Sequence, residues 1–125
     1  MRLTICIAAA VVFCSASALA KPTTFQIKET TWTFTDKKEG KVKETIDADG
    51  NYIAETIGGK HLDHGTAVMK SSKACFTSAM DKEGEVCWTT PHSALAIGHS
   101  FVTTSDKGEK LKVTRVKYTK LSMPK

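Results

Sequence analysis

Residues 31–51 read T-W-T-F-T-D-K-K-E-G-K-V-K-E-T-I-D-A-D-G-N, and this stretch decides the fold. Trp32 and Phe34 alternate with threonines, and Val42, Glu44 and Ile46 alternate with polar residues, which is the two-residue period of a strand with one buried face. Polar turns follow each run, at 36–40 and 47–51. Both turns contain glycine, which adopts the positive φ that tight hairpin turns need. The stretch therefore predicts antiparallel strands joined by hairpins.

The same rhythm continues in both directions, with no sustained 3.6-residue apolar period. Further strand candidates are 52–57, 65–69, 73–80, 85–90, 99–104 and 111–121. The apolar stretch 93–97, between Pro91 and Gly98, could form a helical turn or a buried loop. We predict one all-β domain, an antiparallel meander of about eight short strands that closes as a small barrel or folds as a sandwich. The residues expected in its core are Phe25, Ile27, Trp32, Phe34, Ile46, Ile53, Val68, Phe76, Val86, Trp88, Phe101, Val113 and Val116.

Residues 1–20 have the three parts of a cleavable signal peptide. Arg2 supplies the positive charge, an apolar stretch reaches Phe13, and 18–20 read A-L-A before the expected cleavage site. The apolar stretch of about 11 residues is too short for a bilayer, which needs about 20. Lipoprotein processing at Cys14 is disfavoured because bulky Phe13 precedes it. We expect a periplasmic or secreted domain, residues 21–125, that does not span the membrane.

Cleavage after residue 20 removes two of the four cysteines and leaves Cys75 and Cys87. In an oxidising compartment we expect these two to form one disulfide, and a free reactive thiol is the alternative. A turn centred on 81–84 does not place them directly opposite each other, so we expect a bulge near Gly84. Loss of Arg2 lowers the formal net charge from +5 to +4. This mild basicity does not indicate a nucleic-acid partner.

The last strand candidate carries a run of positive charge. Leu111 and Val113 share one parity, whereas Val116 and Tyr118 share the other, so we expect a β-bulge near 114–115. The bulge would gather a basic stripe on the outer face. A solvated edge strand is the simpler interpretation, and contact with an anionic envelope surface is the alternative. The stripe consists of Lys110, Lys112, Arg115 and Lys117.

No catalytic or metal-binding motif emerges from the chain. His61 and His64 lie three apart and would face opposite sides of a strand, so they would converge only at a turn. Residues 47–51 resemble part of a calcium loop, but Gly58 stands where such a loop needs a glutamate. Nucleophile, phosphate-loop and zinc-protease signatures are absent from the sequence. We therefore assign no catalytic residue, no metal and no cofactor, and we leave the ligand-binding residues unknown.

One segment carries a family resemblance. Its order is D-G-N-Y at 49–52, G-K at 59–60, G-T at 65–66, K-A-C-F at 73–76 and C-W at 87–88. This resembles small exported proteins of proteobacteria that have no assigned activity. Ala67 and 71–72 depart from the family pattern, which has an aromatic residue and Asp-Gly there. The resemblance implies a lipocalin-like or small β-barrel fold, a periplasmic origin and pairing of Cys75 with Cys87, but no activity.

Three classes of function remain open. We favour a non-catalytic binding module for a small apolar ligand or an envelope component. The second is an inhibitor-like or envelope protein-interaction domain that uses a surface loop such as 91–98. A small hydrolytic or metal-dependent enzyme is the least favoured. A pocket lined by aromatic side chains would favour the first class, and converging histidines or carboxylates would favour the third.

Overall fold

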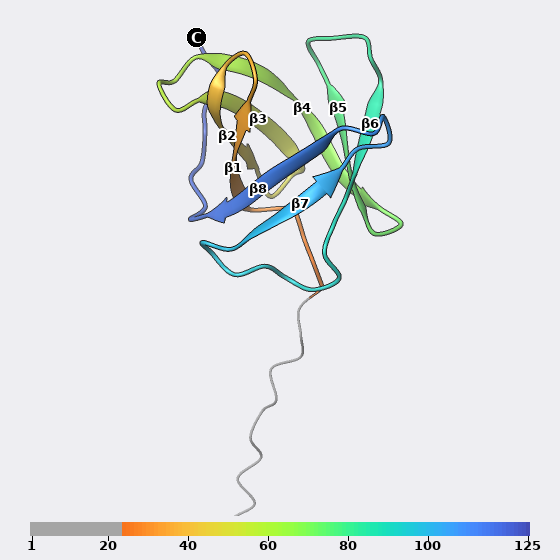
Figure 1. Cartoon of the computed structure of the whole chain (residues 1–125). Coiled ribbons are helices and arrows are strands. Elements are labelled where there is room, and N and C mark those ends of the chain that lie inside the picture. The colour runs from red at the N-terminus through yellow and green to blue at the C-terminus, as the bar shows by residue number, and fades with distance from the viewer. Residues whose placement is uncertain (1–23) are drawn as a thin grey trace, which may run out of the picture.

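The computed structural model describes residues 24–125, which form one antiparallel β-barrel (Figure 1). Neighbours pair along the chain from β1 to β6, and β8 then lies between β1 and β7. The predicted all-β meander is therefore confirmed. The described residues contain no helix that could cross a membrane, and the predicted signal peptide lies outside them. The strands are β1 (Thr30–Asp36), β2 (Gly40–Ile46), β3 (Asn51–Thr56), β4 (His61–Lys70), β5 (Lys73–Ser78), β6 (Glu85–Thr89), β7 (Ser100–Thr104) and β8 (Lys110–Val116).

A few bonds between β6 and β7 bring the two edges of the sheet together. An antiparallel bridge joins Trp88 to Ser105, and the Asp106 amide donates to the Cys87 carbonyl oxygen at 3.0 Å. The Thr103 hydroxyl on β7 donates a hydrogen bond to the Thr89 carbonyl oxygen on β6 at 2.7 Å. These bonds replace a full ladder, so the sheet forms a nearly closed barrel rather than a sandwich.

The alternation of side chains along each strand separates the inside of the barrel from the outside. The predicted core is confirmed for Phe25, Ile27, Trp32, Ile46 and Val113, which are all buried. Other predicted core residues are only half-buried. Five of them line the interior space described below, namely Phe34, Phe76, Val86, Trp88 and Phe101.

The prediction that Val68 is buried was wrong. Val68 is 46 % exposed, whereas its neighbour Ala67 is buried. Opposite residues on paired antiparallel strands point to the same face, and Val68 is paired with Cys75, one position away from the inward-facing Ala74. The β-branched side chain therefore lies on the outer surface, and smaller Ala67 takes the inward position.

The N-terminal segment closes one end of the barrel. Phe25 packs against Trp32 and Phe101, and the three ring centroids lie 5.8–6.0 Å apart. Leu95, from the loop that joins β6 to β7, packs against this core. The stretch 93–97 is therefore a loop rather than a helical turn. Burial of each large apolar side chain stabilises this end by roughly 1.5–3 kcal/mol.

The predicted disulfide joins β5 to β6. Cys75 and Cys87 are direct cross-strand partners, with their Cα atoms 3.9 Å apart. The bulge that we expected near Gly84 is absent from the pairing. The connecting loop spans residues 79–84 and is centred near Asp81. Cys75 and Cys87 each lie six residues from Asp81, so they come directly opposite each other.

The bulge that we expected near 114–115 is also absent. β8 pairs with β1 and with β7 without a shift in register. Arg115 therefore shares the inward face with Val113, is half-buried, and donates from Nη1 to the Leu95 carbonyl oxygen at 2.5 Å. The basic stripe loses Arg115, while Lys110, Lys112 and Lys117 remain exposed. β8 also ends earlier than predicted, and the Thr119 carbonyl beyond it accepts a hydrogen bond of 2.8 Å from the Thr45 hydroxyl.

Candidate functional site: the barrel cavity

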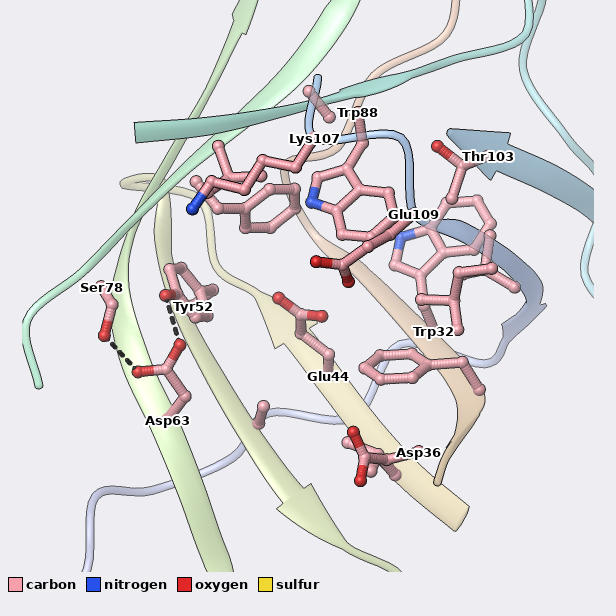
Figure 2. A pocket seen from close by; sticks show the side chains of 18 of the residues that line it. Trp32, Asp36, Glu44, Tyr52, Asp63, Ser78, Trp88, Thr103, Lys107 and Glu109 are labelled. Carbon is pink, nitrogen blue, oxygen red and sulfur yellow. Dashed lines mark hydrogen bonds between the residues drawn. The ribbon is translucent and has the colours of Figure 1, made fainter. Parts of the chain in front are cut away.

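A cavity of about 910 Å³ occupies the barrel interior (Figure 2). Specific small-molecule sites fall in the range of about 300–1,000 Å³. An eight-stranded barrel is just wide enough to hold one small ligand when side chains do not fill it. The mouth lies at the end formed by the β1–β2, β5–β6 and β7–β8 connections, opposite the end closed by Phe25.

Small inward-facing side chains on one side of the barrel leave this space open. Ala54 on β3, Ala67 on β4 and Ala74 on β5 are all buried. Larger residues at these positions would fill the barrel. Tyr52 packs edge-on against Phe76 across the same wall, with ring centroids 5.2 Å apart. The cavity therefore has an aromatic wall and unfilled volume beside it.

Two carboxyl groups project into this cavity from neighbouring strands. Glu44 on β2 is the direct partner of Ala54, and Ala54 is the direct partner of Asp63 on β4. All three lie in one row on the inner face, with the small alanine between the two acids. Two strand spacings of about 4.8 Å separate the backbones of the acidic residues. Trp32 continues the row on the other side of Glu44.

Two hydroxyl groups hold the Asp63 carboxylate in place. The Tyr52 hydroxyl donates to Oδ2 at 2.7 Å, and the Ser78 hydroxyl donates to Oδ1 at 2.5 Å (Figure 2). Each oxygen thus accepts one bond and keeps one further acceptor position free. Burial, followed by the bond to Asp63, raises the pKa of Tyr52 above its usual value, so this phenol keeps its proton and donates it in the bond to Asp63.

Glu44 has neither a hydrogen-bond donor nor a cation beside it among the described residues. The residue lies deep in the barrel, and the part of its surface that stays accessible faces the cavity (Figure 2). Burial, followed by the nearby Asp63 charge, raises the pKa of Glu44 from 4.5 to about 8. The free protein therefore carries Glu44 mainly as the neutral acid at pH 7.

Charges of both signs surround the mouth, in contrast to the interior. Lys107 forms an ion pair with Glu83 across the entrance. The Glu109 side chain also faces the pocket (Figure 2). All three are exposed. The remaining charged residues along the mouth are exposed too, and they are Asp36, Lys37, Lys38, Asp81 and Lys110.

The histidine pair lies apart from this cavity, on the outer face. The register of β4 against β3 shifts at Leu62, so His61 and His64 come to the same face. Their rings approach to 3.0 Å between Nε2 and Nδ1, which corrects our expectation that they would converge only at a turn. No third histidine, cysteine or carboxylate of residues 24–125 joins them within ligand distance. The one such cluster of three found there contains both disulfide cysteines.

Sequence reasoning missed both cavity acids as site residues. Asp63 falls between the predicted strands 52–57 and 65–69, and no acidic residue was predicted to face the barrel interior. A usable signal existed for Glu44, because it occupies the inward parity between Val42 and Ile46. The loop 91–98, which an inhibitor-like function would use, buries part of Leu95 and leaves Ile97 exposed.

Compared with known proteins, the chain matches no family model, no curated protein and no solved structure.

Proposed function

We propose that this protein is a non-catalytic exported binding module that holds one small, largely apolar ligand inside its barrel. The observation that carries the proposal is the cavity of about 910 Å³, whose wall is aromatic and which contains a few fixed polar groups. Such a combination is the usual design of a ligand pocket: apolar surface supplies affinity, and placed polar groups supply orientation. Larger side chains could fill this volume, whereas an open cavity lowers the stability of the fold because packing contacts are lost.

Export belongs to the same proposal. The disulfide between Cys75 and Cys87 fits an oxidising compartment, where such bonds persist. The signal-peptide pattern at residues 1–20 points the same way. The resemblance to exported proteobacterial proteins stays a prediction. A binding module in the envelope would meet its ligand outside the cytoplasm.

Binding can be tested with N-phenyl-1-naphthylamine, an apolar fluorophore that is uncharged at neutral pH. The only two tryptophans of the chain, Trp32 and Trp88, both line the cavity. We expect saturable one-to-one binding with energy transfer from these tryptophans to the probe.

A matched pair of variants on β3 tests the location. Ala54→Leu places extra volume in the cavity and should weaken probe binding at least ten-fold. Ile53→Leu alters the neighbouring, outward-facing position and should leave binding unchanged. Thermal unfolding monitored by circular dichroism verifies that both variants fold. Equal binding by the two folded variants, or binding without saturation, would contradict the proposal.

An acid–base enzyme is the second candidate, because Glu44 holds a proton beside a second carboxyl group. A neutral acid next to a carboxylate is the pairing that general acid catalysis uses. Incubation with 4-nitrophenyl esters and glycosides separates the two functions. Turnover that is lost in Glu44→Gln would favour the enzyme, whereas probe binding without turnover favours the binding module.

A further inference from the structure

The two carboxyl groups deep in the cavity have acceptor positions that no described residue fills. Asp63 keeps one free acceptor position on each oxygen after its bonds to Tyr52 and Ser78. Glu44 keeps all of its acceptor positions. Buried polar groups are almost always paired in native structures. A ligand that supplies hydrogen-bond donors would therefore occupy these cavity-facing acceptor positions.

The charge of the cavity also lacks a partner. The protein as a whole is basic, with a formal net charge of +5, yet no lysine or arginine lies beside Glu44 or Asp63. The lysines that reach the cavity are exposed residues of the mouth, and Lys107 is already bound to Glu83. A basic protein whose cavity carries only acidic charged groups at its deep end has a site that favours positive charge.

We propose that the ligand of this cavity is an organic cation, an apolar body that carries a protonated amine, and that Glu44 and Asp63 bind its ammonium group. The inference rests on the binding function proposed above. The small Ala54 between the two acids leaves room for an ammonium group at the midpoint of the row. Its three N–H donors can reach both carboxylates, and charge-assisted bonds of this kind are about twice as strong as neutral ones.

The aromatic wall fits the same ligand. Trp32 is the direct cross-strand partner of Glu44, and Tyr52 is bonded to Asp63, so aromatic rings flank both acids. The face of an aromatic ring attracts a cation, most strongly when water is excluded. An anionic ligand would meet two carboxyl groups at the same place, and a neutral ligand would leave the free acceptors of Asp63 in place.

Binding of the cation should release a proton. The ammonium group favours the ionised form of Glu44, which the free protein keeps mainly protonated at pH 7. With a pKa of about 8, roughly 0.9 proton should leave per ligand bound at pH 7. The other groups that face Glu44 are Asp63 and the Tyr52 phenol, which share one hydrogen bond. Glu109, Glu83 and Lys107 face it only from the mouth.

Isothermal titration of the purified exported domain with three matched naphthyl compounds tests the inference. They are 2-(1-naphthyl)ethylamine, 2-(1-naphthyl)ethanol and 1-naphthylacetate, which share one apolar body and differ in charge. We expect the amine to bind about 10- to 100-fold more tightly than the alcohol, because hydrogen bonds that involve charged groups are stronger than neutral ones. The acetate should bind most weakly. Titrations in buffers of different ionisation enthalpy give the number of protons released.

Variants assign the effect to the two acids. Glu44→Gln should reduce the preference for the amine over the alcohol to about two- to threefold and abolish proton release. Asp63→Asn should also reduce the preference for the amine, because it removes the second carboxylate that binds the ammonium group. Glu55→Gln removes an equal charge from the outer face of the same wall and should behave as wild type.

The possible failures have different meanings. Equal binding of amine and alcohol would overturn the cation inference and leave the binding function standing. An amine preference that survives in both Glu44→Gln and Asp63→Asn would also overturn it. Failure of all three compounds and of N-phenyl-1-naphthylamine would overturn both proposals.

Discussion

Replacing Glu44 with glutamine should stabilise the ligand-free barrel, and the gain should increase with pH. The pKa of Glu44 is about 8 in the folded protein, against an ordinary value of 4.5, first because the carboxyl group is buried and second because Asp63 lies nearby. Between these two values the folded state holds a proton that the unfolded state has lost. The free energy of unfolding of wild type must therefore fall as pH rises through this window.

The magnitude follows from the two pKa values. Their difference of about 3.5 corresponds to about 5 kcal/mol, reached only above pH 8. Between pH 5 and pH 8, Glu44 should cost wild type about 3 kcal/mol of stability relative to Glu44→Gln, since contact with cavity water moderates the burial. All other ionisable groups are common to both proteins, so their contributions cancel in the comparison.

The assay is urea unfolding at pH 5, 6, 7 and 8, monitored by tryptophan fluorescence. We expect the two proteins to be similar at pH 5 and to diverge steadily toward pH 8, with Glu44→Gln more stable. Glu55→Gln, which changes an outward-facing residue opposite Lys43, should parallel wild type. Identical pH profiles for wild type and Glu44→Gln would refute the reasoning, because they would mean that Glu44 ionises as freely in the barrel as in the unfolded chain.

Three further predictions concern the fold and the outer surface. Replacing both Cys75 and Cys87 with alanine should lower the free energy of unfolding by about 2–3 kcal/mol, since the bond closes a short loop, and reductant should raise the intact mass of the wild type by two hydrogens. Gly65→Ala should cost at least about 2 kcal/mol, because a Cβ there would lie 2.0 Å from a backbone oxygen of β5. In the control Gly58→Ala the added Cβ would make only an ordinary contact of 3.8 Å with the Thr56 hydroxyl, and stability should change by less than about 0.5 kcal/mol. Any adhesion to anionic lipid vesicles should fall with rising salt, and also when glutamine replaces the three exposed lysines of the basic stripe, Lys110, Lys112 and Lys117.

Each of these has an outcome that would count against it. An unchanged mass under reducing conditions would remove the disulfide from the account. A Gly65→Ala protein as stable as Gly58→Ala would show that β4 and β5 can separate locally without cost. Vesicle co-sedimentation that is equal for wild type and the lysine variant would leave the stripe as a solvated outer face of β8, which is an inner strand of the sheet rather than the predicted edge strand.

The strands could be predicted from the sequence because their signal is local. Alternation around Trp32 and Phe34, and glycine-containing turns such as the one at Gly50, where φ is +84°, locate each hairpin within a few residues. Closure of the barrel could not be predicted in the same way. It depends on a bridge between Trp88 and Ser105, which belong to different hairpins and reveal nothing of their pairing in sequence.

The site was harder to predict than the fold for a similar reason. The sequence alone shows that Glu44 is an acid at an inward-facing strand position, but whether it lines a cavity depends on whether other side chains fill the barrel. Asp63 gave no usable signal. It falls between the predicted strands 52–57 and 65–69, and it lies beside the register shift at Leu62, which carries His61 to the outer face. The local alternation of side chains therefore predicted the strands of the barrel wall. That Glu44 and Asp63 lie near each other across three strands could be seen only in the folded barrel.

The most direct test of the central claim is a crystal structure of the protein grown with 2-(1-naphthyl)ethylamine. The account predicts the naphthyl ring inside the barrel against the aromatic wall, with the amine nitrogen within hydrogen-bonding distance of Glu44 and Asp63. An amine bound only on the outer surface, or a cavity that contains nothing but water at saturating amine, would contradict it.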